Sequence, residues 1–215
     1  MKEIAVALSV CACLALCAIV SCGDDESTVA DAGGASGAQT EAYFALSGTK
    51  TYHGTQELDT GTSPIDYDVA YAADTTTFNG RATIKRTWTT GGFLQLTEWF
   101  EVKGDKLYFL RYQYMDKNAK LVDIAFPAAT PVLYGKDPWS DADPALSTTV
   151  GSDLYEYSLV MESVTVPAGT FDGAFKVYAN EAGRNSLYYF VPSTGVVKYQ
   201  INKHPALGTI AIELK

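Results

Sequence analysis

The stretch from Phe93 to Met115 reads FLQLTEWFEVKGDKLYFLRYQYM, and its pattern decides the fold class. Apolar side chains in its first half recur at a period of two, the repeat of a β-strand: Leu94, Leu96, Phe100 and Val102. Glu98 alone interrupts that face. A tight turn with glycine follows at KGDK, and the returning segment shows on one side Tyr108, Leu110, Tyr112 and Tyr114. The stretch therefore predicts an antiparallel β-hairpin.

The same period continues on both sides of this hairpin. Upstream, one alternating face holds Ala82, Ile84, Arg86 and Trp88. Near residue 215 the alternating residues are Ile210, Ile212 and Leu214. No segment longer than about ten residues carries the 3.6-residue repeat of an amphipathic helix. We expect an all-β domain with little helix, built as a curved antiparallel sheet in the form of a half-barrel, an open barrel or a sandwich.

Two further turns have explicit signals. In Val166-Pro-Ala-Gly169 the proline pre-sets φ and the glycine suits the last turn position. In Val191-Pro-Ser-Thr-Gly195 the glycine can take the left-handed conformation of a bulged hairpin. These turns predict two strand pairs: Tyr155–Val166 with Phe171–Ala179, and Ser186–Val191 with Val196–Ile201.

Composition narrows the classes of partner. The chain has 16 Lys+Arg against 25 Asp+Glu, a formal net charge of −9, and an acidic surface repels phosphate backbones. We therefore expect no nucleic-acid partner. All four cysteines lie between positions 11 and 22, so the folded part has no thiol for a disulfide or a zinc site. No motif indicates a cofactor.

The N-terminal segment indicates export and a lipid anchor. Ile4–Val20 is an apolar run broken only by Ser9, and it ends in Ile-Val-Ser-Cys22. That tetrapeptide resembles the lipobox of bacterial lipoproteins, which implies cleavage before Cys22 and two or three acyl chains on it. Multiple chains are what stable anchoring requires. Gly23, where Asp would favour inner-membrane retention, implies placement in the outer membrane of a bacterial envelope.

These features divide the chain into three parts. Residues 1–21 are the expected lipoprotein signal peptide. Residues 22–41 comprise the lipidated cysteine and a tether of small and acidic residues, GDDESTVADAGGASGAQTE, which we expect to be disordered. Residues 42–215 form the single antiparallel β domain.

Part of the domain also resembles a signature of bacterial envelope lipoproteins. The matching residues are Thr165-Val-Pro-Ala-Gly-Thr-Phe171, Lys176-Val177, Tyr188-Tyr-Phe-Val-Pro192 and Gly195-Val-Val-Lys198. The resemblance covers about residues 131–215 and implies the two turns and the strands between them, with no agreed catalytic residues. A more distant likeness is to the curved half-barrels of periplasmic lipoprotein carriers, whose sheets fold around helices that this chain does not show.

Candidates for chemistry are few. His53 and His204 are the only histidines, and we expect both on the surface or in loops, because no Gly-x-Ser-x-Gly segment presents a serine nucleophile. Alternating carboxylates at Asp137, Asp141 and Asp143 could ligate Ca²⁺, although the spacing lacks the glycine and closing glutamate of an EF-hand. A solvated acidic loop explains them equally well. We expect no enzymatic activity.

The aromatic residues supply the remaining hypothesis. Apolar groups lie on both faces of Phe93–Val102, which indicates either a fold covered on both faces or a concave surface that binds an apolar molecule or a sugar. For the second case the ligand-binding candidates are Trp88, Trp99, Tyr108, Tyr112 and Tyr114. We therefore expect a membrane-anchored, non-enzymatic envelope lipoprotein whose curved sheet serves as a binding or interaction scaffold, with an aromatic-lined concave surface as the site if it binds a small molecule. The alternative is a structural or assembly partner of another envelope protein, and a hydrolase is the least favoured reading.

Overall fold

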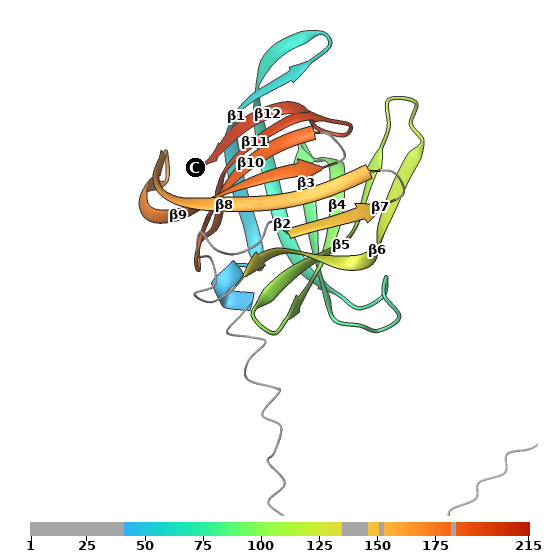
Figure 1. Ribbon diagram of the computed structural model, residues 1–215. Coiled ribbons are helices and arrows are strands. Elements are labelled where there is room, and N and C mark those ends of the chain that lie inside the picture. Colours follow the sequence, from blue (N-terminus) through green and yellow to red (C-terminus); the bar gives the residue numbers. More distant parts are fainter. Residues whose placement is uncertain (1–40, 135–145, 151–152, 182–183) are drawn as a thin grey trace, which may run out of the picture. The chain divides into compact units, whose positions relative to one another are not determined.

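A computed structural model describes residues 41–134, 146–150, 153–181 and 184–215 of the protein. Within these residues twelve strands form one antiparallel sheet, which is curved and open (Figure 1). The fold class expected from the sequence is therefore confirmed. A short helical turn at residues 41–44 precedes the first strand. In the described part of the chain, no helix has the length and apolar composition needed to cross a bilayer.

The strands of the first half are β1 Gly48–Leu58, β2 Gly61–Asp74, β3 Thr83–Thr90, β4 Phe93–Lys103, β5 Lys106–Met115 and β6 Leu121–Tyr134. The strands of the second half are β7 Leu146–Val150, β8 Asp153–Val166, β9 Gly169–Glu181, β10 Arg184–Val191, β11 Gly195–His204 and β12 Gly208–Leu214. Both predicted C-terminal hairpins are present, as β8–β9 and β10–β11.

The strand order follows the chain with one long-range exception. Read across the sheet it is β6-β5-β4-β3-β2-β1-β12-β11-β10-β9-β8-β7, so nearly every strand pairs with its neighbour in sequence. The exception is β1 with β12, where Tyr52 lies opposite Leu214 and Glu57 opposite Thr209. This pairing joins two meanders of six strands each, and β6 and β7 form the two edges.

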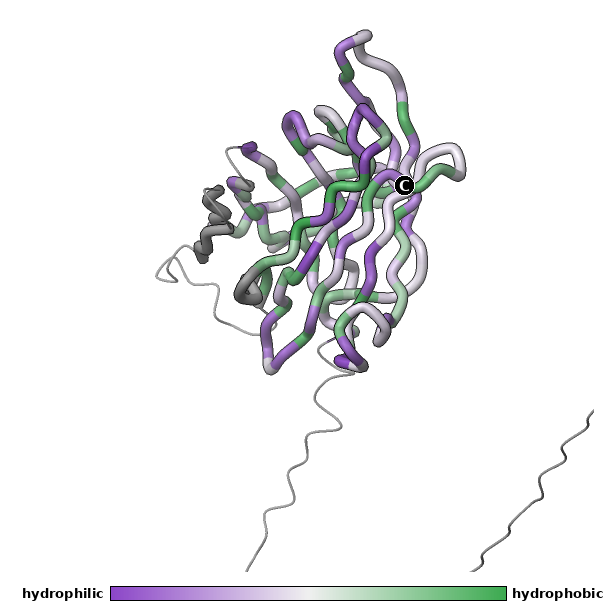
Figure 2. Tube along the Cα trace, turned by 90° about the vertical axis from the view of Figure 1, so that its right-hand side faces the viewer, coloured by the Kyte–Doolittle hydropathy of each residue, from purple (hydrophilic) through white to green (hydrophobic). Residues whose placement is uncertain are grey.

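Curvature brings strands that are distant in the sheet into contact across its concave face. The ring of Trp88 on β3 packs edge-on against Tyr199 on β11, with 4.8 Å between ring centroids. Tyr188 on β10 donates a hydrogen bond to the carbonyl oxygen of Val132 on β6 at 3.5 Å. Figure 2 shows hydrophobic and hydrophilic residues alternating along the strands. One alternating set therefore builds a common interior, as a sheet with one buried face requires.

Two of the β-bulges, in β4 and β5, change side-chain faces that the sequence pattern predicts. Phe100 pairs with Phe109 but Trp99 pairs with Arg111, so Leu110 is an extra residue in β5. The extra residue reverses the alternation, and Tyr112 joins Leu107 and Phe109 in the core while Leu110 lies outside that cluster. The predicted common face of Tyr108, Leu110, Tyr112 and Tyr114 is therefore wrong.

The second bulge lies at the start of β4. Trp88 pairs with Leu96 and Thr89 with Leu94, which leaves Gln95 as the extra residue. Leu94, predicted to share the face of Leu96, is instead 59% exposed at the tip of the β3–β4 hairpin, and Phe93 beside it is 74% exposed. An extra residue reverses the side-chain faces that a strict period of two would predict.

The outer face of β4 is covered by side chains and not by a second layer of sheet. Trp99 is only 5% exposed, although it alternates with the inward-facing Glu98 and Phe100. Its indole nitrogen donates to Asp74 at 2.9 Å, and the Arg111 guanidinium lies 5.1 Å from the ring centroid. The indole hydrogen bond holds the pKa of Asp74 below its usual value, with the help of bonds from Thr76. Apolar residues on the two faces of β4 therefore have different causes: Phe100 packs in the core, and Trp99 on the outer face is covered by Asp74 and Arg111.

Candidate functional site

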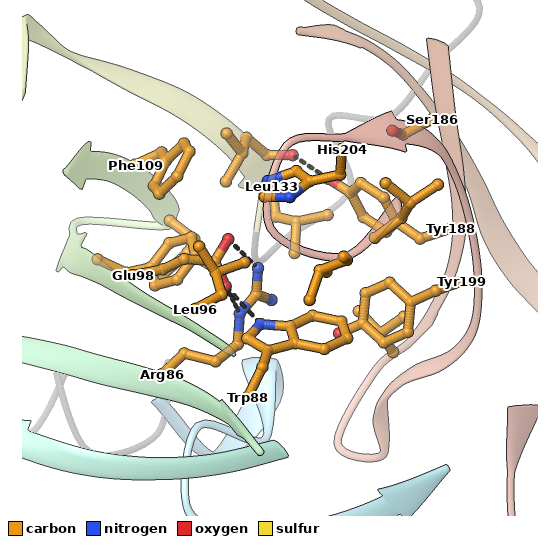
Figure 3. Close-up of a pocket in the computed structure, with 16 residues that line it drawn as sticks. Arg86, Trp88, Leu96, Glu98, Phe109, Leu133, Ser186, Tyr188, Tyr199 and His204 are labelled. Atoms are coloured by element: carbon orange, nitrogen blue, oxygen red, sulfur yellow. Dashed lines mark hydrogen bonds and ion pairs between the residues drawn. The ribbon is translucent and has the colours of Figure 1, made fainter. Parts of the chain in front are cut away.

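A cavity opens on the concave face between the two meanders (Figure 3). Its apolar walls come mainly from β4, β5, β6 and the β11–β12 connection: Leu96, Phe100, Leu107, Phe109, Leu133 and Leu207. Its polar lining comes from Arg86, Glu98, Ser186, Tyr199 and His204. The volume is about 70 Å³ on the scale where one water needs roughly 10–15 Å³, so the space exceeds that of a single buried water.

An ion pair is buried in the wall of this cavity. Arg86 and Glu98 lie opposite each other on β3 and β4, and the guanidinium donates from Nε at 2.6 Å and from Nη2 at 2.8 Å to the two carboxylate oxygens. The indole nitrogen of Trp88 donates a third hydrogen bond to Glu98, at 2.6 Å. Burial opposes the charge on Arg86, but the adjacent Glu98 carboxylate raises the pKa of the guanidinium well above its ordinary value. Arg86 therefore keeps its charge, and the carboxylate that accepts its two hydrogen bonds balances that charge.

Two hydroxyl groups in the cavity wall have no hydrogen-bond partner among the described residues. They are Tyr199 Oη on β11 and Ser186 Oγ on β10, and both residues are at least nine-tenths buried. Two other core tyrosines differ, since Tyr52 donates to the carbonyl oxygen of Val196 at 2.6 Å and Tyr67 accepts from Gln56 at 3.0 Å. An unsatisfied buried hydroxyl costs about 1–3 kcal/mol, so a partner from outside the chain is expected here.

His204 ends β11 and is buried against the same cavity, so its predicted surface position is wrong. The reason is the tight connection to β12: the backbone nitrogen of Ala206 donates to His204 Nδ1 at 3.1 Å and holds the ring inward. Gln56 fixes the same connection by donating to the carbonyl oxygen of Leu207 at 2.8 Å. Burial lowers the pKa of His204 to about 4, so the imidazole is neutral at pH 7, and because Nδ1 accepts, Nε2 carries its proton.

The other histidine behaves as expected. His53 on β1 is exposed and its Nδ1 lies 2.7 Å from the Asp66 carboxylate on β2. The two residues face each other in register across the β1–β2 ladder. An exposed pair of this kind contributes little to stability, and it lies outside the cavity lining.

The structure separates the five aromatic candidates into three groups. Trp88 lines the cavity. Tyr112 and Tyr114 face the same interior, with ring centroids 6.4 Å and 6.0 Å from that of His204, but they do not line the cavity. Trp99 packs on the outer face, and Tyr108 lies on that face as well because it alternates with the core residues Leu107 and Phe109. Of the five, only Trp88 therefore lies where a ligand in this cavity could touch it.

The remaining sequence candidates lie outside the described residues. They are the lipidation site Cys22 and the calcium candidates Asp137, Asp141 and Asp143. Among the residues that the structure does describe, no three His, Cys, Asp or Glu side chains come together as a metal site.

The residues that sequence reasoning missed had left a signal. Arg86 and Glu98 each place a charge on an otherwise apolar strand face, and an antiparallel pairing of their strands would bring the two charges opposite each other. A charge on a buried face is rare unless it is paired, so the two interruptions together indicate a buried ion pair. Ser186, Tyr199 and His204 had no comparable signal, because their meeting depends on the curvature of the sheet.

The lining combines apolar walls with a small set of polar groups. Activation of a serine requires a base within hydrogen-bond reach, and Ser186 Oγ forms no hydrogen bond with His204 or any other described residue. The site instead offers apolar walls with a few converging polar groups, the common composition of small-molecule pockets. Comparison of the chain with protein-family models, with curated proteins and with solved structures found no match.

Proposed function

We propose that the protein is a lipid-anchored component of a bacterial envelope that binds a small molecule in the cavity on the concave face of its sheet. The observation that carries the binding proposal is the pair of unpartnered hydroxyls, Tyr199 and Ser186, in the wall of that cavity. Protein interiors are packed densely and their buried polar groups are satisfied. A cavity with unsatisfied hydroxyls is therefore better explained as a ligand-binding site than as a packing defect.

The anchor half of the proposal depends on the lipobox resemblance at Ile19-Val-Ser-Cys22. A Cys22→Ser variant cannot accept acyl chains, so we expect it to leave the membrane fraction or to accumulate as a precursor of higher mass. Fractionation of cells and mass measurement of the wild type and the variant would distinguish these states. A variant that is processed and membrane-bound like the wild type would contradict the anchor.

The binding half can be tested by native mass spectrometry of the lipidated protein in detergent. Ile201 on β11 lines the cavity, and its neighbour Gln200 is exposed and absent from the cavity lining. We expect a non-covalent adduct of defined mass on the wild type and on Gln200→Trp, and its loss from Ile201→Trp, whose indole fills the cavity. Wild-type protein without any adduct, or an adduct that survives Ile201→Trp, would argue against this cavity as the site.

A second candidate function, docking of another envelope protein, is favoured by a different observation. Phe93, Leu94, Met115 and Leu121 are exposed apolar residues on the neighbouring β3–β4 and β5–β6 hairpins. They lie at the same end of the sheet, because β4 pairs with β5 and Met115 pairs with Leu121. Apolar side chains gathered at one exposed end are typical of interaction surfaces. A photo-crosslinker at position 93 that captures one stoichiometric protein in cells, with none captured from the exposed outer position 200, would support this function.

A further inference from the structure

The polar groups of the cavity that lack a partner in the described part of the chain are hydrogen-bond donors, and this limits the chemical class of the ligand. Glu98 already accepts three hydrogen bonds, two from Arg86 and one from Trp88. The groups that remain can all donate: the hydroxyls of Tyr199 and Ser186 have no partner among the described residues, and His204 carries its proton on Nε2 because Nδ1 accepts from Ala206. A ligand that satisfies this wall must therefore offer hydrogen-bond acceptors.

The electrostatic balance of the cavity argues against a charged ligand. Arg86 is the cation of the lining and Glu98 its anion, and each neutralises the other at hydrogen-bond distance. His204 is neutral at pH 7, because burial lowers its pKa to about 4. A carboxylate or an ammonium group would therefore enter a desolvated space whose described lining holds no free counter-charge, and burial of an unpaired charge is strongly unfavourable.

The remaining lining is apolar and fits a hydrocarbon portion of the same ligand. Leu96, Phe100 and Phe109 form the wall on β4 and β5, and Leu207 closes it from the β11–β12 connection. Figure 3 shows these apolar walls on β4 and β5 facing Ser186, Tyr188 and Tyr199 across the space. Apolar surface of a ligand that leaves water for this cavity stabilises the complex through the hydrophobic effect.

From these three observations we infer that the cavity binds an uncharged carbonyl compound with a short hydrocarbon body, such as an acyl ester or amide, whose carbonyl oxygen accepts hydrogen bonds from Tyr199 and Ser186. This inference rests on the proposed function and adds the chemical class of the ligand. The volume of about 70 Å³ admits a short chain and not a full-length fatty acyl chain, since it corresponds to roughly five to seven water positions.

The test compares four probes of matched length and different head groups: methyl hexanoate, hexanoate, hexylammonium and heptane. Binding of each is measured by calorimetry with the lipidated protein in nanodiscs, and empty nanodiscs provide the reference for partitioning into lipid. We expect methyl hexanoate to bind at least roughly tenfold more tightly than either charged probe. We also expect it to bind more tightly than heptane, which lacks an acceptor.

The variant Tyr199→Phe removes only the unpartnered hydroxyl and should fold normally, which thermal unfolding can check. We expect this variant to bind methyl hexanoate roughly 3- to 10-fold more weakly than the wild type, and to bind heptane with the same or a higher affinity. Tyr67→Phe is the matched control, because that buried hydroxyl already accepts a hydrogen bond from Gln56 and is absent from the cavity lining. Its effect on the ester should be small.

The outcomes separate this inference from the proposed function. Equal binding of heptane and the ester, with no effect of Tyr199→Phe, would overturn the carbonyl assignment and leave the cavity as a binding site. Tightest binding of hexanoate or hexylammonium would likewise overturn it. If no probe binds and Ile201→Trp removes no native adduct, both the ligand class and the proposed function fail.

Discussion

Removal of one partner from the buried Arg86–Glu98 pair should be far more damaging than removal of both charges. In Arg86→Met the Glu98 carboxylate loses two of its three hydrogen bonds and keeps only the one from Trp88. The side chains of Arg86 and Glu98 are only 16% and 10% exposed, so water cannot replace the lost partner. A buried ion left alone in this way costs about 3–5 kcal/mol.

The double variant Arg86→Met with Glu98→Gln tests whether the unpaired charge is the cause. The glutamine amide oxygen can still accept from the Trp88 indole nitrogen, and no charge remains in the wall. We expect the double variant to lose no more than about 2 kcal/mol, since uncharged replacements of buried pairs are often tolerated. The two substitutions should therefore be coupled by at least about 2 kcal/mol, well beyond the additivity of independent sites.

Urea denaturation of the protein and its variants, followed by fluorescence, measures these differences as shifts in the midpoint at constant slope. At a domain of this size the loss for Arg86→Met corresponds to a fall in Tm of roughly 6–20 °C. A single variant that loses less than about 1 kcal/mol, or a double variant as unstable as the sum of the singles, would refute the reasoning. The first result would mean that water reaches Glu98, and the second that the pair contributes packing and not charge balance.

Two further predictions concern His204 and Gly54. His204 has a pKa of about 4 in the folded protein and 6.5 when unfolded, and Glu98, Arg184, Tyr112 and Tyr114 lie around it. Its contribution to the free energy of unfolding is therefore constant above pH 6.5. As the pH drops from 6.5 through 4, stability falls by about 3 kcal/mol. Denaturation of wild type and His204→Gln at several pH values checks this, and parallel profiles would contradict it. At Gly54 a Cβ would lie 1.9 Å from the carbonyl oxygen of Ala211, so the Gly54→Ala variant must push β1 away from β12. We expect this variant to lose at least about 3 kcal/mol of stability. Gly104→Ala is the control, because Gly104 lies in open space at a φ of +63°, and it should lose only about 1–2 kcal/mol. Equal losses for the two variants would show that the sheet adjusts freely at Gly54.

The fold class followed from local patterns, and the side-chain faces did so only in part. Turn chemistry at Pro167 and Gly195 located two hairpins, because proline and glycine restrict the backbone in ways that depend on few neighbours. The bulges at Gln95 and Leu110 had no such signal. Each depends on how its partner strand pairs, so Leu94 and Tyr112 were assigned to the wrong faces by a strict period of two.

The candidate site was less predictable than the sheet, for a reason of geometry. Trp88, one of the predicted ligand-binding residues, lines the cavity because it shares the inward face of β3 with Arg86. Trp99, the other tryptophan of the candidate set, packs outside against Asp74 and Arg111. Tyr199 and His204 meet β3 and β4 only because the sheet curves, and curvature is a property of the whole sheet that no short segment encodes.

The pairing of β1 with β12 has a consequence for the order in which the chain can assemble. Each six-strand meander forms from hairpins that close over short distances, but residues 52–57 must wait for residues 209–214 before the two halves become one body. During synthesis from the N-terminus, β1 therefore has one unpaired edge until β12 arrives, and an unpaired edge can pair with other chains. The step most exposed to aggregation, and most sensitive to a C-terminal truncation, is the arrival of the last strand in the middle of the sheet.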